Sequence, residues 1–85
     1  YDAYPNPVRP DYFGPITIDG LVRNSEVKIT DIAGNIVFQT ITNGGRVTWD
    51  GTDFSGNRVS TGVYFALIAD REAITTCISK ILFIN

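Results

Sequence analysis

Hydrophobic and polar residues alternate along most of this chain in short runs, with glycine, asparagine and aspartate between the runs. Because successive side chains of a β-strand point to opposite faces, this alternation predicts half-buried strands. The expected strands are residues 16–19, 27–30, 36–39 and 46–49. In the second of them, we expect Val27 and Ile29 to point inward and Thr30 to point outward.

Two further strands are predicted from longer apolar runs. The segment GVYFALIA is apolar without a break, so a strand is expected over 63–69, buried on both faces. The last strand is expected over 76–84. No segment of about ten residues shows the 3.6-residue period of an amphipathic helix, and no internal repeat is found.

Turn-forming residues divide these strands. Gly20 interrupts the first run and predicts a β-bulge or a turn. The connection 33–35 is so short that it should join two strands as an antiparallel hairpin. The strongest two-residue turn signal of the chain is Asn-Gly-Gly at 43–45.

The first ten residues, YDAYPNPVRP, contain three prolines. Each proline removes a backbone N–H and fixes φ, which excludes a helix and a central strand. We therefore expect an extended edge segment that is anchored by Tyr4 and Val8.

With 85 residues the chain is expected to form one domain over 1–85. About seven short strands at spacings of roughly 8 to 12 residues are typical of an antiparallel two-sheet sandwich. The predicted fold class is therefore all-β. Because the chain opens without an initiator Met, we expect it to be cut from a larger multidomain protein.

The stretch from Val47 to Tyr64 contains the most ligand-like loop of the chain. Its oxygen-bearing side chains could suit a hard cation such as calcium; they belong to Asp50, Asp53, Ser55 and Asn57. The loop lacks the spacing of a twelve-residue calcium loop, and the same residue types favour turns, so turn chemistry is the preferred interpretation. Three glycines are expected to serve as structural turn positions, namely Gly51, Gly56 and Gly62.

Composition argues against several classes of function. The net charge is −2 and the seven basic residues are scattered, so no nucleic-acid partner is expected. Histidine is absent, which removes the commonest general base and metal ligand, and no catalytic residue, metal or cofactor is predicted. Cys77 is the single cysteine and is interpreted as a small buried hydrophobe.

The aromatic residues divide into two groups. The expected core contains Trp49, Phe38 and Phe65. In contrast, Tyr12, Phe13 and Phe54 are expected in loops, where they could form a core lid or a contact surface. An exposed aromatic platform would suit a carbohydrate-binding module, which stays open as an alternative.

The chain ends with an almost uncharged apolar tetrad at residues 81–84. A terminal strand of this kind must be paired inside the fold or be offered to a partner by strand addition. Internal pairing is preferred, and pairing between copies of the chain through edge strands stays open.

Four blocks of the sequence resemble the C-terminal domain of the bacterial type IX secretion system, found in the Bacteroidetes. They are AYPNPV at 3–8, ITIDGL-x-x-NSEVKITDIAGNIV at 16–37, GG-x-x-x-WDG-x-x-x-x-G-x-x-V-x-x-GVY at 44–64, and KILFIN at 80–85. The third block is also similar to the immunoglobulin-like domain of flagellar hook-capping proteins. The resemblance implies a seven-stranded immunoglobulin-like sandwich.

The resemblance also implies a function. Domains of this family direct a parent protein to the cell surface, where a sortase usually removes the domain and anionic lipopolysaccharide is attached to the cargo. The implied partners are the outer-membrane translocon, its shuttle and the sortase or attachment complex. The implied location is the periplasm in transit and then the outer-membrane cell surface.

Within the family, the segments 8–21 and 43–51 are most similar to a surface protein that keeps the domain as part of the attachment complex. The preferred interpretation is therefore a non-enzymatic sorting or docking domain that is retained, and a cleaved cargo signal is the alternative. A carbohydrate-binding or purely structural immunoglobulin-like module is the second alternative. The residues expected to be recognised by partners lie at the two ends of the chain: Pro5, Asn6, Pro7, Lys80, Ile81, Leu82, Phe83 and Ile84.

Overall fold

The computed structural model describes residues 2–21, 24–42, 44–69 and 75–84 of the chain. These parts contain seven strands. They are β1 (Asp2–Tyr4), β2 (Ile16–Leu21), β3 (Glu26–Thr30), β4 (Ile36–Ile41), β5 (Gly45–Trp49), β6 (Gly62–Ala69) and β7 (Thr75–Phe83). None of these described segments forms a helix that could cross a membrane.

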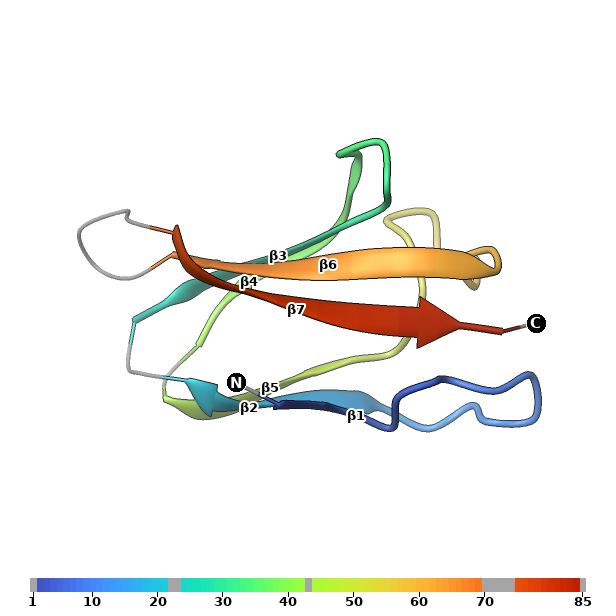
Figure 1. Cartoon of the computed structure of the whole chain (residues 1–85), viewed down its shortest axis with the longest axis horizontal. Helices are drawn as coiled ribbons and strands as arrows, with labels where there is room; N and C mark the ends of the chain where they lie inside the picture. Colours follow the sequence, from blue (N-terminus) through green and yellow to red (C-terminus); the bar gives the residue numbers. More distant parts are fainter. Residues whose placement is uncertain (1, 22–23, 43, 70–74, 85) are drawn as a thin grey trace.

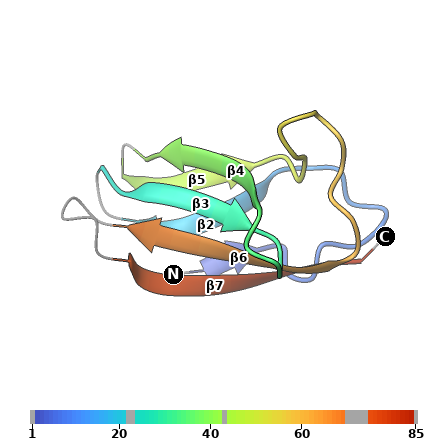
Figure 2. The same ribbon diagram turned by 90° about the horizontal axis from the view of Figure 1, so that it is seen from above.

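The strands form two sheets that pack face to face (Figures 1 and 2). The three-stranded sheet has the order β1-β2-β5 and the four-stranded sheet has the order β4-β3-β6-β7. Every strand pair within these sheets is antiparallel. The predicted all-β, seven-stranded sandwich is confirmed.

Two turn predictions are confirmed in detail. The residues between β3 and β4 do form an antiparallel hairpin, in which Ile29 pairs with Phe38. Gly20 lies where the β2–β5 register shifts, with φ of 78°, so the predicted bulge exists because glycine adopts positive φ without a Cβ clash.

The turn signal at 43–45 has a different role from a hairpin. It leads from β4 to β5, which belong to different sheets, so this connection crosses from one layer of the sandwich to the other. Residue 43 itself lies outside the described residues. A local turn motif cannot distinguish a hairpin from a sheet-to-sheet crossing, because that depends on where the two strands find their partners.

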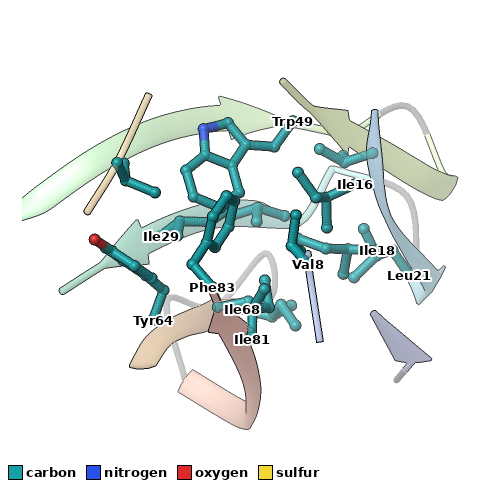
Figure 3. Packing of buried hydrophobic residues seen from close by; sticks show 14 residues of the cluster. Val8, Ile16, Ile18, Leu21, Ile29, Trp49, Tyr64, Ile68, Ile81 and Phe83 are labelled. Carbon is teal, nitrogen blue, oxygen red and sulfur yellow. The ribbon is translucent and has the colours of Figure 1, made fainter. Parts of the chain in front are cut away.

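The core lies between the sheets and is centred on Trp49, which is 1% exposed (Figure 3). The Phe83 ring lies edge-on to the indole at 5.4 Å between centroids, and Tyr64 lies 5.5 Å from Phe83. Aliphatic side chains complete the core, among them Val8, Ile16, Ile18, Val27, Ile29, Ile68 and Ile81. The expected core position of Trp49 is confirmed, and Phe38 packs partly buried against this cluster.

The expectation that residues 63–69 are buried on both faces is wrong. In β6 the side chains alternate: Tyr64, Ala66 and Ile68 are buried, whereas the residues between them are only partly buried. Phe65 belongs to this second set and does not fill the core. The run is apolar on both faces, but only one face is covered by the opposite sheet.

Thr30 points to the outer face of its sheet, as expected, but it is only 6% exposed. It pairs with Phe65 of β6 and with Ile36 of β4, beside a register shift in the β3–β4 ladder. Large neighbours on both sides leave little of a threonine accessible in a central strand. Val27 and Ile29 are buried as expected.

Candidate docking site at the paired chain ends

The N-terminal segment 5–8 lies along the outer edge of β7, so the two ends of the chain form one surface. Val8 forms a parallel bridge with Phe83. The Val8 N–H donates to Leu82 O at 2.7 Å, and the Ile84 N–H donates to Val8 O at 2.8 Å. We call residues 5–8 and 80–84 together the terminal edge site.

Asn6 continues this ladder with its side chain. Its Nδ2 donates to Lys80 O at 2.7 Å, and its Oδ1 accepts from the Leu82 N–H at 3.0 Å. A carboxamide offers one donor and one acceptor side by side, as a peptide group does, so Asn6 takes the place of a strand residue at this edge. The prolines on either side of Asn6 have no backbone N–H to donate, and the Asn6 side chain supplies the donor to Lys80 O.

The terminal strand is therefore paired on both sides. Its inner edge pairs with β6 and its outer edge, over residues 80–84, with the N-terminal segment. Of the two outcomes considered from the sequence, internal pairing is the one found. A partner that adds a strand at residues 80–84 would first have to displace segment 5–8.

The side chains expected to be recognised divide into buried and accessible sets. Ile81 and Phe83 are 0% exposed and belong to the core. Lys80 is exposed, Leu82 is 40% exposed and Ile84 is half-buried. Asn6 is exposed between the half-buried Pro5 and Pro7. In the folded domain a partner can thus meet Lys80, Leu82 and the Pro-Asn-Pro segment, but not the two core residues.

Arg58 supports this site, and sequence reasoning missed it. Its Nη1 donates to Tyr12 O at 2.9 Å and its Nη2 donates to Arg9 O at 3.1 Å. The guanidinium lies over the ring of Phe83, 5.3 Å from its centroid, and over Phe13 at 5.0 Å. One arginine thus ties the loop before β2 to the loop before β6 and to β7. Only the folded chain brings these partners together.

The loop 50–61 shows turn chemistry at the residues considered for a cation. Asp53 Oδ1 accepts from the N–H groups of Ser55 and Asn57 at 2.9 and 3.1 Å. Asp50 Oδ1 accepts from the Thr52 N–H at 3.1 Å. In the described part of the chain, no three His, Cys, Asp or Glu residues are grouped so that they could hold a metal ion. Cys77 of β7 pairs with Ile68 of β6, but the Cys77 side chain is not among the side chains that the structure describes.

The three glycines expected at turns take different positions. Gly51 and Gly56 have φ of 79° and 83°, within the loop. Gly62 has φ of 159° and is the first residue of β6 rather than part of the turn. Gly51 alone is crowded: a Cβ there would lie 3.1 Å from Phe83 Cζ and 3.4 Å from Ile16 Cδ1.

A second copy of the Asp53 turn occurs after β3 and was not recognised in the sequence. In Asp31-Ile32-Ala33-Gly34-Asn35, Asp31 Oδ1 accepts from the N–H groups of Ala33 and Asn35, as Asp53 does in Asp53-Phe54-Ser55-Gly56-Asn57. The shared pattern Asp-x-x-Gly-Asn is the signal that could have revealed it. Each turn exposes an apolar side chain at its second position, Ile32 at 78% and Phe54 at 73%.

Two ionisable groups near the first turn have shifted pKa values. The Asn35 side-chain amide donates to Asp31 Oδ2 at 3.0 Å, and this bond with the backbone bonds lowers the pKa of Asp31. Burial raises the pKa of Tyr64, with a smaller contribution from the negative charge of Asp31. The Tyr64 hydroxyl donates to Ser60 O at 2.7 Å, which fixes the start of β6.

The loop aromatics are partly accessible. Tyr12 packs against the core, and its hydroxyl donates to Pro15 O at 2.7 Å. Phe13 is 78% exposed, beneath the Arg58 guanidinium.

Comparison with known proteins gives two matches. Residues 2–84 match the family described as the secretion system C-terminal sorting domain. The chain is also similar to the solved structure of PorZ, an essential bacterial surface component of the type IX secretion system of Porphyromonas gingivalis, with 36% identity and a TM-score of 0.89. That match covers 99% of this chain and 11% of the PorZ chain. No curated protein matches.

Proposed function

This chain belongs to the secretion system C-terminal sorting domain family, and from that premise we propose that the terminal edge site is the surface by which it is sorted. Membership assigns it a role in type IX secretion, in which its parent protein is exported through the outer membrane to the cell surface. We further propose that it works without catalysis, through surfaces on a rigid sandwich, as the C-terminal domain of a larger protein.

One observation carries the choice of site. Asn6 hydrogen-bonds Lys80 and Leu82, so segments 74 positions apart in sequence form one surface with Lys80 accessible on it. The predicted recognition residues came from opposite ends of the chain, and a partner could contact both together. This supports joint recognition of the Pro-Asn-Pro segment and the end of β7.

The partners proposed for this surface are components of the secretion machinery: the outer-membrane translocon, its shuttle and the attachment complex, with anionic lipopolysaccharide nearby. Transit through the periplasm is part of the same proposal. We propose that the domain is retained after export, because over 99% of this chain it is similar to PorZ, which is itself a surface component of the secretion system and not described as a cargo.

The test is a reporter fusion. A periplasmic reporter joined to residues 1–85 is expressed in a type IX host, and surface reporter is measured by protease accessibility on intact cells. We expect the fusion to reach the surface and the reporter alone to stay inside. A fusion that stays inside would contradict the sorting role.

The fate of the domain is measured in the same cells. Retention predicts that surface reporter keeps the mass of the full fusion, including the domain. A shortened product that carries lipopolysaccharide would contradict retention and support the cleaved cargo signal instead.

The role of the terminal edge site is tested by Asn6→Asp, which removes the donor to Lys80 O. Asn57→Asp makes the same chemical change at an exposed loop position and serves as the control. If the site is recognised, Asn6→Asp should lower surface reporter by about fivefold in cells grown well below its melting temperature. Equal export of the two variants would show that this site is not the one recognised.

A further inference from the structure

The outer faces of the two sheets differ in chemistry. In the three-stranded sheet, the buried Ile18 and Val47 point inward, so the residues next to them in β2 and β5 point outward. These outward residues are polar: Thr17, Asp19, Arg46 and Thr48. Tyr4 on β1 joins them and donates its hydroxyl to Asp19 Oδ2 at 3.3 Å. This face has the composition of a solvated sheet.

The outer face of the four-stranded sheet is apolar along β6 instead, although β3 and β4 add the polar Glu26, Lys28 and Gln39 to it. Because Tyr64, Ala66 and Ile68 point into the core, the outward residues of β6 are Val63, Phe65 and Leu67. Val63 pairs with Leu82 of β7, and Phe65 lies in one row with Thr30 and Ile36. We call Ile36, Val63, Phe65, Leu67 and Leu82 the outer apolar face.

The described residues of the chain leave this face partly open. Ile36 and Leu82 are each 40% exposed, and the three residues of β6 are half-buried. An antiparallel sheet with one solvated face normally alternates apolar and polar residues, as the three-stranded sheet of the same molecule does. A contiguous apolar face on a small domain is a mark of an interaction surface.

The charges on this face favour one kind of occupant. Lys28 Nζ lies 3.4 Å from Glu26 Oε1, so these two charges neutralise one another. Lys80 pairs with Phe65 across β6–β7 and is exposed, which gives the described residues of this face a net positive charge. Two copies stacked through this face would oppose their positive charges, which disfavours a dimer.

The position of β1 also favours a separate molecule as the occupant of this face. β1 belongs to the three-stranded sheet, in the opposite layer from the outer apolar face (Figure 1). None of the strands that the structure describes therefore lies over the outer apolar face. A separate molecule is the better candidate to cover the apolar layer.

We propose that the outer apolar face docks a protein of the secretion machinery whose contact surface is apolar and carries a carboxylate opposite Lys80. The proposal rests on the proposed function and extends it, since Leu82 belongs both to this face and to the terminal edge site, and Lys80 of that site lies at the rim of the face. It predicts that residues of β6, far from the N-terminal segment, take part in sorting.

Two substitutions test the face in the reporter fusion. Leu67→Glu places a carboxylate on the face, beside Lys28, its cross-strand neighbour, which helps to keep the sheet intact. Thr48→Glu makes the same addition on the polar face and is its control. Lys80→Glu reverses the charge at the rim, and Arg46→Glu is the matched reversal on the polar face. Thermal melts followed by Trp49 fluorescence check the fold of all four.

We expect Leu67→Glu and Lys80→Glu to lower surface reporter about tenfold, while the two controls stay within about twofold of the unchanged fusion. If the unchanged fusion is exported and Leu67→Glu gives as much surface reporter as Thr48→Glu, the docking proposal is overturned and the sorting role stands. If Leu67→Glu does not fold, Ile36→Glu against Thr48→Glu decides, because both sites are exposed and β4 lies at the opposite edge of the sheet from the terminal edge site.

Light scattering of purified residues 1–85 tests whether a second copy of the chain covers the face. We expect a monomer for the unchanged chain and for all four variants. A dimer that Leu67→Glu or Lys80→Glu dissociates would overturn the proposal and assign the face to a second copy of the chain.

Discussion

At the scale of single residues, a side chain takes the place of a backbone strand in hydrogen bonding to the outer edge of β7. Asn6 supplies both a donor and an acceptor to β7, at 2.7 and 3.0 Å. The edge therefore depends on the amide itself and not only on a polar residue at this position.

This dependence predicts the order of two variants at Asn6. Asn6→Ala removes both hydrogen bonds, while Asn6→Asp removes the donor and places a charged oxygen where Nδ2 lay, 2.7 Å from Lys80 O. We expect a loss of about 1–2 kcal/mol for Asn6→Ala and about 2–3 kcal/mol for Asn6→Asp. Urea unfolding followed by Trp49 fluorescence measures both. A smaller loss for Asp than for Ala would contradict the requirement for a donor.

Three glycines with different surroundings allow a second prediction. Gly62→Ala has space, but its φ of 159° is one that residues with a Cβ rarely adopt, so we expect a loss of about 1 kcal/mol. Gly56→Ala has space but adopts left-handed φ, so we expect a loss of about 1–2 kcal/mol. Gly51→Ala adds a contact at 3.1 Å from the Phe83 ring to the same strain, and should lose about 2–4 kcal/mol.

Thermal melts of the three Gly→Ala variants rank these losses. The difference between Gly51→Ala and Gly56→Ala isolates the close packing of the loop on the core. Equal melting temperatures for those two variants would mean that Phe83 moves away at no cost.

At the scale of elements, two loops repeat one arrangement. In both Asp-x-x-Gly-Asn turns, the aspartate carboxylate accepts two N–H groups and its own N–H donates to the asparagine carbonyl. The first turn closes the β3–β4 hairpin and the second precedes β6. Their carboxylates are thus committed to the backbone.

The hydrogen bonds of the first turn predict how Asp31 titrates. Because hydrogen bonds favour the ionised form, the pKa of Asp31 is lowered, led by the Asn35 side chain. A lowered pKa in the folded state stabilises the fold above the pKa of the unfolded chain, and this stabilisation disappears as the pH falls through the folded pKa. Asn35→Ala should raise the Asp31 midpoint toward its ordinary value, as measured by carboxyl NMR. An unchanged midpoint would show that backbone donors alone set it.

Local patterns explain which elements the sequence could reveal. Alternation located four of the six strands after β1, because a half-buried strand needs that period, and longer apolar runs located the other two, in each case to within two residues at both ends. The same reasoning failed for β6: apolar side chains on both faces showed that each face avoids water, but not that only one of them is covered by the opposite sheet.

The candidate site was predictable only in part. Pro-Asn-Pro and residues 80–84 were identified through the family resemblance, but not their contact, which joins Asn6 to a strand 74 positions away. Arg58 gave no sequence signal at all, because its partners Tyr12, Arg9 and Phe83 come from separate segments. Contacts of this kind depend on the register of the whole sandwich.

At the scale of the whole molecule, β7 serves two purposes that must be separated in any experiment. Its inward residues, Ile81 and Phe83, are fully buried, while Lys80 and Leu82 face outward. A deletion of the chain end therefore removes part of the core together with the accessible residues. Loss of export after such a deletion would not identify a recognition site.

Deleting residues 80–85 should unfold the domain. Loss of buried Ile81 costs about 2–5 kcal/mol and loss of buried Phe83 about 3–5 kcal/mol, even before the hydrogen bonds to Asn6 and Val8 are counted. Together these losses approach the whole stability of a small domain, about 5–15 kcal/mol. We expect the deleted chain to lose its cooperative melt in circular dichroism, whereas Lys80→Glu should keep its melting temperature within a few degrees. A deleted chain that still melts cooperatively would show that β6 can serve as the sheet edge, and that residues 80–84 are free to bind a partner by strand addition.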